Sequence, residues 1–573
     1  MYRVLVIEER HAIADLLVAR LRESPVVQFC QRMRLRKADS GSLRVRAVAD
    51  ELDHHSIDTV VYSPSRCPRL LVAPDIVEAE AILRQSAKSN LKRFVLLSSA
   101  QIYGASSHNQ GLIPESRLPV CLNRSQLARE WIALEAIVAR HLHNCVTKLT
   151  MLRPAAVLIA GGSDYFSRLM RGPLAIVLPG HDPSLQFLSP DDLAAAVRCA
   201  VDRSNGGVYN VAPEGVITLR SALRLTAARR VTFPRTLRRI VSSTDHLDLI
   251  RYSWTVSNKK IKSALGYTPT HSSAEAVAEF VEADNGNRRL LDESMKLDEF
   301  DDFGMDKDYI AAYGRTLFKF LFEHYWRVEH KGLDHVPSEG RAVLVGVHRG
   351  FMPWDAVMTL HLVVRQLKRY PRFLIHPGLI KFPFLFNFHT KLGGMIACQE
   401  NADYVLERDE LLTIYPEGIR GAFSLFHQPY RLKRFRDDYV KIALRHRAPI
   451  VPFATVGNAE IFPILARIDW SWWKRWTEWP FFPITPTWPL LPVPLPSKWH
   501  LQFLASIHIE DRYPPEAADD TAAVKEITAE VKAHLAQAID QMLSRRKSVW
   551  FGSIFGDEAV KREQSVPREE QVT

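Results

Sequence analysis

The chain has 573 residues, of which 47% are hydrophobic and 24% are charged. This length is too great for one compact core and this composition excludes a disordered protein, so two or more folded domains are expected. The net charge of +11 fits an anionic partner, such as an anionic membrane face, coenzyme A, an acidic carrier protein or nucleic acid, although a mildly basic protein needs no such partner.

The first 285 residues predict alternating strands and helices. Tyr2–Ile7 predicts a strand and Ala12–Leu21 a helix. Thr59–Tyr62 and Phe94–Leu97 predict two buried strands, with a helix at Ile76–Ser86 between them. Alternation of this kind implies an α/β fold with a parallel sheet that helices cover on both faces.

Five short segments of this half resemble the extended short-chain dehydrogenase/reductase family, in its nucleotide-sugar epimerase branch. They follow the family's order and lie at residues 95–104, 152–154, 186–193, 207–211 and 264–269. The resemblance implies an NAD-dependent epimerase/dehydratase-like domain over residues 1–285, built on a Rossmann-like, doubly wound parallel sheet.

The dinucleotide-binding pattern of that family is missing. Glycines after the first strand let the backbone approach the pyrophosphate at a helix N-terminus. The family's three glycine positions are occupied here by Glu8, His11 and Ala14. Glu8 and Glu9 would place side-chain bulk and negative charge where a diphosphate has to bind.

The family's catalytic pattern is also incomplete. Ser99 matches the catalytic serine, but Leu122 stands in place of the tyrosine and Gln126 in place of the lysine. Neither substitute exchanges protons near neutral pH. We therefore expect a degenerate domain that serves as a scaffold, a binding module or a regulator, with no NAD(P) bound.

Around residue 292 the composition changes. Residues 292–308 contain eight acidic residues and two lysines, a charge run that is expected to be solvated. We predict an acidic linker over residues 286–308, a second domain over 309–545 and a disordered tail over 546–573. The alternative, an acidic helix on the surface of a single domain, stays open.

The second domain begins with an aromatic-rich helix, predicted over Tyr309–Trp326. The strand Ala342–Val347 leads into His348, and the strand Leu411–Tyr415 leads into Pro416-Glu-Gly. A helical repeat of apolar residues predicts an amphipathic helix near the end, at Val524, Ile527, Val531, Leu535 and Met542.

His348 has the position of a general base. The loop Arg349–Met352 leads to Pro353, which is favoured in the first turn of a helix, and Asp355 would lie in that turn. Acylation of a hydroxyl by a thioester needs a base, a carboxylate that orients it, and donors for negative charge. A single histidine is more often structural, so the assignment depends on its surroundings.

Four segments resemble the glycerol-phosphate and lysophosphatidate acyltransferase family over roughly residues 325–545. The segment from Val347 to Asp355 resembles the family's His-x-x-x-x-Asp block, and Tyr415-Pro-Glu-Gly-Ile-Arg420 resembles its Pro-Glu-Gly-Thr-Arg block. Lys391–Ile396 and Ala448–Ala454 resemble two further segments, in the right order. The resemblance implies a C-terminal α/β acyltransferase domain.

The same resemblance implies roles for single residues. It makes His348 and Asp355 catalytic, and it assigns substrate binding to Arg349, Glu417, Gly418 and Arg420. A guanidinium group such as that of Arg420 suits a phosphate or carboxylate, although a solvated loop arginine is the alternative.

The chain departs from the family in one spacing. Six residues rather than four separate His348 from Asp355, as in the diacylglycerol acyltransferase-like branch. This spacing shifts the expected acceptor from a phosphorylated glycerol toward a neutral lipid alcohol, and it leaves open whether the two side chains meet.

Seven of the twelve tryptophans lie between Trp470 and Trp499, together with Lys474 and Arg475. Indole favours the lipid headgroup boundary and basic groups meet anionic lipid, so we expect contact with a membrane surface. A long loop packed on the core is the alternative. The uncharged stretch Trp479–Ser497 contains seven prolines, which exclude a membrane-spanning helix.

We therefore predict an O-acyltransferase of lipid metabolism that serves phospholipid biosynthesis. It would move a fatty acyl group from acyl-CoA or acyl-carrier protein to a lipid hydroxyl, as a cytoplasmic protein peripheral to the inner face of the membrane. The six cysteines are scattered, which argues for a reducing compartment and against structural zinc. We expect no metal, no tightly bound cofactor and no nucleic-acid partner. Two alternatives stay open: an inactive lipid-binding or scaffold protein, and a nicotinamide-dependent epimerase or reductase that acts through the N-terminal half.

Overall fold

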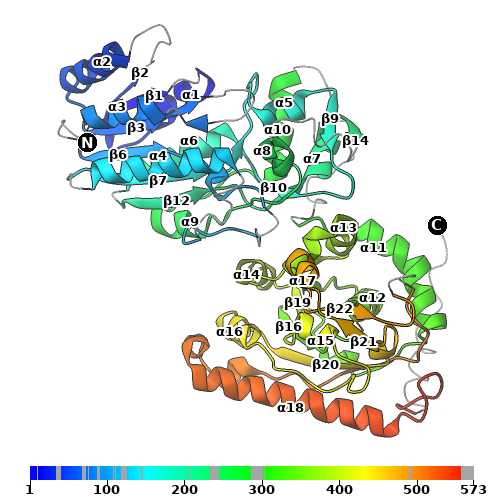
Figure 1. Cartoon of the computed structure of the whole chain (residues 1–573). Helices are drawn as coiled ribbons and strands as arrows, with labels where there is room; N and C mark the ends of the chain where they lie inside the picture. The colour runs from blue at the N-terminus through cyan, green and yellow to red at the C-terminus, as the bar shows by residue number, and fades with distance from the viewer. Residues whose placement is uncertain are drawn as a thin grey trace, which may run out of the picture. The chain divides into compact units, whose positions relative to one another are not determined.

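The computed structural model divides the chain into two compact units, Met1–Gly304 and Met305–Thr573 (Figure 1). The division falls inside the segment predicted as the acidic linker. The structure describes residues 1–8, 11–33, 41–66, 73–74, 76–86, 91–106, 109, 111–117, 125–143, 146–203, 205–226, 228–232, 244–285, 301, 303–350, 352–488 and 493–556.

A six-stranded parallel sheet forms the centre of the first unit. Its strands lie in the order β12 (Gly207–Val211), β7 (Lys148–Pro154), β6 (Arg93–Leu97), β3 (Thr59–Ser63), β1 (Tyr2–Glu8) and β2 (Val27–Met33). The strand order reverses beside β1, because β2 lies on one side of it and all later strands on the other. This is the topology of a doubly wound sheet with a switch point between β1 and β3, which confirms the predicted fold class.

Helices cover both faces of this sheet. On one face, Leu5 and Ile7 of β1 belong to an apolar cluster with α2 (Gly41–His54), α3 (Ile76–Ser86) and α4 (Gln126–Leu142). On the other face, Val4 and Val6 pack with α1 (His11–Arg22) and α6 (Pro190–Asp202). Because both faces are buried, the strands are continuous apolar runs, and the sequence predicted β1, β3, β6, α1 and α3 to within one residue.

The other elements of this unit are shorter. The helices are α5 (Tyr165–Arg171), α7 (Leu219–Leu225), α8 (Thr244–Leu249), α9 (Lys259–Leu265), α10 (Ser273–Asn285) and the 3-10 turn Ala100–Tyr103. The short strands pair as β4 (Ser65–Arg66) with β5 (Ala73–Pro74), β8 (Ala156–Val157) with β11 (Phe187–Leu188), β9 (Leu174–Val177) with β14 (Arg229–Thr232), and β10 (Ser184–Leu185) with β13 (Ile217–Thr218).

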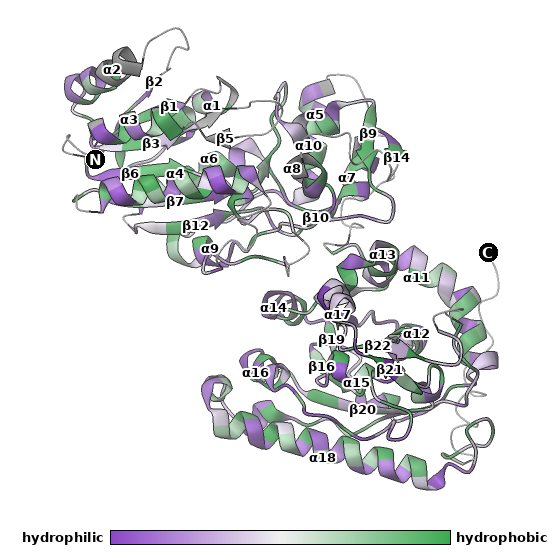
Figure 2. Cartoon of the chain, in the orientation of Figure 1, coloured by the Kyte–Doolittle hydropathy of each residue, from purple (hydrophilic) through white to green (hydrophobic). Residues whose placement is uncertain are grey.

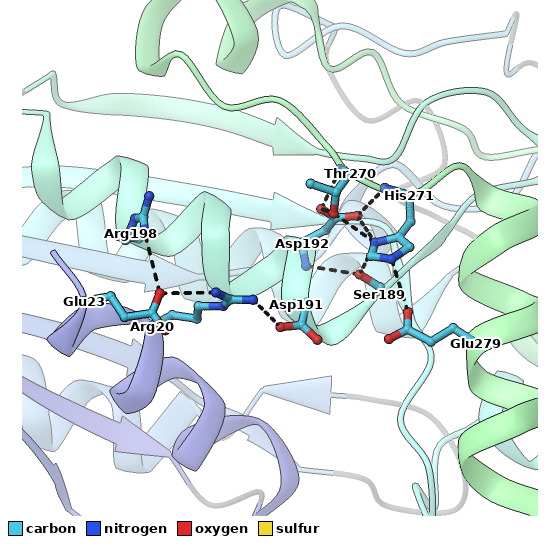
Figure 3. A network of polar contacts seen from close by, with 9 residues as sticks. All are labelled: Arg20, Glu23, Ser189, Asp191, Asp192, Arg198, Thr270, His271 and Glu279. Carbon is cyan, nitrogen blue, oxygen red and sulfur yellow. Dashed lines mark hydrogen bonds and ion pairs between the residues drawn. The ribbon is translucent and has the colours of Figure 1, made fainter.

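A polar network fixes the start of α6 (Figure 3). The buried Asp192 carboxylate accepts hydrogen bonds from the backbone N–H of Thr270 at 2.8 Å and from the Thr270 hydroxyl at 2.7 Å. His271 adds its backbone N–H at 3.1 Å. Arg20 of α1 binds the neighbouring Asp191 at 2.9 Å. The network therefore ties α1, α6 and the segment after α9 together, and its donors satisfy the buried carboxylate.

A seven-stranded sheet forms the centre of the second unit. Its order is β15 (Glu329–Lys331), β23 (His500–Phe503), β20 (Ile450–Val456), β16 (Ala342–Gly346), β19 (Leu411–Ile414), β17 (Arg372–Ile375) and β18 (Gly394–Ile396). Neighbouring strands are parallel except β20 and β23. Three of the strands that carry the predicted acyltransferase blocks, β16, β19 and β20, therefore lie side by side and point the same way.

Helices surround this sheet. They are α11 (Lys307–Tyr313), α12 (Trp354–Leu367), α13 (Pro383–Lys391), α14 (Gln399–Glu407), α15 (Ile419–Ala422), α16 (Asp438–Arg445), α17 (Ser471–Thr477) and α18 (Thr521–Arg545). The predicted helix Tyr309–Trp326 is formed by α11 and two π-helical turns, Gly314–Phe318 and Leu321–Tyr325. A hairpin of β21 (Ala466–Ile468) and β22 (Phe482–Ile484) flanks α17 in sequence. No described helix has both the length and the apolar content to cross a bilayer.

The long α18 lies beside β20 (Figure 1) and confirms the predicted amphipathic helix. Apolar and polar residues alternate along it (Figure 2), and its buried residues include Val524, Ile527, Val531, Leu535 and Met542.

Residues 546–556, which were predicted as part of a disordered tail, pack on this unit instead. Arg546 forms an ion pair of 2.5 Å with Glu460, and both side chains are largely buried. The backbone N–H of Lys498 donates to the Val549 carbonyl at 2.8 Å. These contacts order the segment, while residues 557–573 lie outside the described part of the chain.

Candidate active site

Three adjacent parallel strands bring the predicted catalytic blocks to one edge of the second sheet. His348 follows β16, Glu417 follows β19, and Asn458 follows β20. The carboxyl ends of parallel strands meet at the same edge, which is where open α/β sheets bind their ligands. The fold therefore gathers residues that are far apart in the sequence.

His348 and Asp355 form a hydrogen-bonded pair. The Nδ1 atom of His348 lies 2.8 Å from Asp355 Oδ2 and 2.9 Å from Oδ1. Asp355 is fully buried in the first turn of α12, where the helix dipole favours negative charge. The longer spacing between the two residues therefore still permits the pair.

Other donors hold the Asp355 carboxylate in place. Its Oδ2 accepts from the backbone N–H of Arg349 at 3.0 Å and from Asn458 Nδ2 at 3.2 Å, and its Oδ1 accepts from the backbone N–H of Ala356 at 2.9 Å. These donors satisfy both oxygens of the buried carboxylate. It fixes the imidazole with the proton on Nδ1, so that Nε2 carries the lone pair. The His348 side chain is 15% exposed, so the protein does not enclose it completely.

Gly350 allows the loop between His348 and Asp355 to close. Its φ is +79°, in the left-handed region that favours glycine, and a Cβ atom there would lie 2.3 Å from the Asn458 carbonyl oxygen. Any side chain at this position would push the loop away from Asn458. Residue 351 of the same loop lies outside the described residues.

Arg349 and Glu417 bind each other. Both side chains are buried, and Arg349 Nη1 and Nη2 lie 2.5 and 3.2 Å from the two Glu417 oxygens. Arg349 Nη1 also donates to the His348 carbonyl at 2.8 Å, and the backbone N–H of Lys433 donates to Glu417. The bidentate pair thus clamps the loop after β16 onto the loop after β19. Arg349 and Glu417, two of the residues predicted to bind substrate, therefore bind each other in this structure.

Gly418 and Arg420 occupy the outer part of the same block. Gly418 adopts φ +56° and ψ −149°, a combination that favours glycine, and α15 begins directly after it. Arg420 is exposed on α15. Of the four residues predicted to bind substrate, Arg420 alone presents an accessible charge.

Three residues of the site were not predicted from the sequence. Asn458 binds Asp355, and Gly421 makes room for the clamp, since an added Cβ would lie 3.0 Å from Arg349 Nη1. The Tyr415 ring packs 5.5 Å from the His348 ring, and burial raises the pKa of the Tyr415 hydroxyl well above 10, with a further contribution from the Asp355 charge. Tyr415 and Asn458 follow strands at this edge, and Gly421 lies in the short helix α15 after β19. These positions are the signal in the sequence that could have found the three residues.

The first unit has a pocket at the carboxyl edge of its own sheet. Its walls include Glu8, Ser63, Ser98, Ser99 and Asp164. Glu8 is the last residue of β1 and is buried where a diphosphate would approach the backbone. Two carboxylates in this pocket would repel a diphosphate, so the residues here do not fit a dinucleotide.

The residues that replace the epimerase catalytic pair offer no acid or base. Gln126 begins α4 and donates to Glu130 at 2.9 Å, whereas Leu122 lies outside the described residues. Ser99 accepts a hydrogen bond from the backbone N–H of Gln101 and so caps a 3-10 turn. The absence of NAD(P) from this unit stays a prediction.

Comparison with known proteins identifies the second unit. The profile of the acyltransferase family matches residues 327–456, which contain the His348–Asp355 pair and the Arg349–Glu417 clamp. Uncharacterized protein Rv0502 of Mycobacterium tuberculosis is 36% identical over 263 residues, which cover 44% of this chain and 72% of that protein. The second unit therefore carries a domain of the acyltransferase family.

Two other likenesses of the chain are more distant. Phytyl ester synthase 2 of Arabidopsis thaliana is 29% identical over 143 residues, which cover 24% of this chain and 20% of that protein. The structure of MoeE5 in complex with UDP-glucuronic acid and NAD matches 50% of this chain and 100% of that chain, with 19% identity and a TM-score of 0.41.

Proposed function

We propose that this acyltransferase moves a fatty acyl group from acyl-CoA or acyl-carrier protein to a lipid hydroxyl, with His348 as general base. The observation that carries the proposal is the geometry of the His348–Asp355 pair. Its Nδ1 is engaged by a buried carboxylate, so Nε2 is the atom available to take a proton.

The reaction needs no covalent enzyme intermediate. His348 Nε2 takes the hydroxyl proton while the acceptor oxygen attacks the thioester carbonyl carbon. The C–S bond of the resulting tetrahedral species then breaks, and the imidazolium returns the proton to the leaving thiolate. Asp355 stabilises the imidazolium between these two steps, as the carboxylate of a Ser-His-Asp triad does.

The other residues of the site hold it in shape or bind substrate. We propose that the Arg349–Glu417 clamp positions the His348 loop, and that Gly418 sets the direction of α15. Arg420 would then bind a phosphate or carboxylate of a substrate, since its planar fork suits either group.

The acceptor is best sought among neutral lipid alcohols of the glycerolipid type. The six-residue spacing between His348 and Asp355 supports this class, and one relative of the chain is a phytyl ester synthase. Such an acceptor resides in a membrane, so we propose that the protein acts at the inner face of the membrane, with the first unit as a scaffold or regulator.

Lipid mass spectrometry tests the function. Cells that express the wild-type chain should contain an ester species that is missing from cells expressing His348→Ala. His508→Ala, which changes an exposed histidine, is the matched control and should leave the ester in place. Identical lipid profiles for wild type and His348→Ala would argue strongly against acyl transfer.

A further inference from the structure

Large aromatic side chains are exposed around α17. Trp470, Trp472 and Trp476 are 40%, 55% and 49% exposed, and Phe384, in the first turn of the neighbouring α13, is 64% exposed. We name these four side chains the tryptophan face. Trp470 stacks on Trp472 at 5.8 Å between ring centroids, and clustered exposed apolar side chains of this size are typical of interaction surfaces.

A layer of buried and partly buried aromatic rings holds the tryptophan face in place. Trp473, which is buried, packs against Trp479 at 5.7 Å and Phe482 at 4.9 Å between ring centroids. Phe382 packs against Trp476 at 5.4 Å and Trp479 at 5.3 Å. The exposed rings are therefore presented by a fixed helix and do not belong to a loosely packed loop.

The same layer reaches the catalytic edge of the sheet. Phe423 directly follows α15, and its ring lies 5.4 Å from Trp479 and 5.3 Å from Phe481. Gly378, which follows β17 at this edge, lies against the carbonyl oxygen of Thr477, where an added Cβ would be 2.7 Å away. The tryptophan face thus lies one layer of side chains away from the segment that carries Gly418 and Arg420.

The charges around α17 are net positive. Lys474 and Arg467 both lie near Asp469, at 2.9 and 3.8 Å, and Lys381 pairs with Glu478 at 2.6 Å. Arg475 is exposed on α17 itself. These four basic and two acidic groups leave an excess of positive charge, which an anionic surface would attract.

We propose that the tryptophan face docks on a lipid bilayer that contains anionic lipid. Indole rings favour the boundary between headgroups and acyl chains, and the basic groups beside them meet the negative surface. Docking in this way places α15, and with it the catalytic edge, at the membrane interface. The proposal deepens the proposed function, because a lipid alcohol would then reach His348 without crossing water.

Co-sedimentation of the full chain with vesicles tests the docking. Wild type should bind vesicles of phosphatidylcholine and phosphatidylglycerol more tightly than vesicles of pure phosphatidylcholine. Trp472→Ser/Trp476→Ser should weaken binding to both on the order of tenfold. Lys474→Gln/Arg475→Gln should weaken binding to the anionic vesicles alone, by about fivefold for each basic group removed.

Phe551→Ser is the matched control, because Phe551 is a 74% exposed aromatic side chain of the same unit outside the tryptophan face. It should bind like wild type. Wild type that stays in the supernatant, or a control that loses as much binding as the tryptophan variant, would overturn the proposal. Thermal melting of each variant separates loss of docking from loss of fold.

Two further measurements separate docking from catalysis. His348→Ala should bind vesicles like wild type, so docking is read independently of acyl transfer. Trp472→Ser/Trp476→Ser should keep its activity on detergent-dispersed substrate and lose it on vesicles. If activity is lost equally in both, the tryptophans serve the chemistry or the fold, and docking is refuted.

Discussion

Asp355→Asn alters the group that holds His348 while keeping its size. The Asp355 carboxylate faces the backbone N–H groups of Arg349 and Ala356, the amide of Asn458, and His348 Nδ1. Whichever oxygen the new amide nitrogen replaces, it meets a backbone N–H donor. If the amide nitrogen turns toward His348 it donates to Nδ1, which moves the ring proton to Nε2 and abolishes the base.

The expected loss of turnover is large. A wrong tautomer in a His–Asp pair of this kind costs about 10⁴-fold in kcat, which corresponds to about 5 kcal/mol. The mismatched donors in a fully buried position should also lower the free energy of unfolding by about 1–3 kcal/mol. Stability therefore changes far less than activity.

The assay is release of free thiol from acyl-CoA in the presence of a lipid alcohol, with urea unfolding measured in parallel. Asp540→Asn, at an exposed position on α18, is the control and should leave both unchanged. A fall in kcat of less than about tenfold for a folded Asp355→Asn protein would show that the carboxylate does not set the His348 tautomer.

Three other perturbations have expected outcomes. Gly350→Ala should destabilise the protein by about 1–3 kcal/mol in thermal melts and lower kcat, because of the positive φ of residue 350 and its close approach to Asn458. Arg420→Ala should raise KM for the anionic acyl-CoA about tenfold, because a guanidinium that binds phosphate is lost. Tm should not change, because the Arg420 side chain is exposed. Burial lowers the pKa of His389 to about 4, so the neutral side chain contributes its full stability above pH 6.5. As the pH falls toward 4, the free energy of unfolding measured with urea should decrease by up to about 3 kcal/mol. His389→Leu should reduce this decrease.

The sequence predicted the strands of the site better than the contacts between them. That His348 and Glu417 both follow apolar strands is visible in the sequence, and their common sheet edge follows from parallel topology. The adjacency of β16 and β20, which brings Asn458 to Asp355, depends on strand order and could not be read from local patterns. The ion pair between Arg349 and Glu417 likewise depends on how the loop after β16 packs on the loop after β19, which local sequence patterns do not show.

The order of residues 546–556 was missed for a related reason. The segment is polar, and local composition favours disorder. Its order comes from Glu460 and Lys498, which lie far away in the sequence. In the first unit, by contrast, Glu8 at the end of β1 was recognisable from sequence because one backbone position decides whether a diphosphate can approach.

Detection of ester product by the purified chain tests the central claim most directly. With acyl-CoA and a lipid alcohol in mixed micelles, wild type should form the ester and release one thiol for each ester bond made. His348→Ala should form it at least about 10³-fold more slowly while it unfolds at the same temperature as wild type. Equal rates of ester formation by the two proteins would contradict the assignment of His348 as the base.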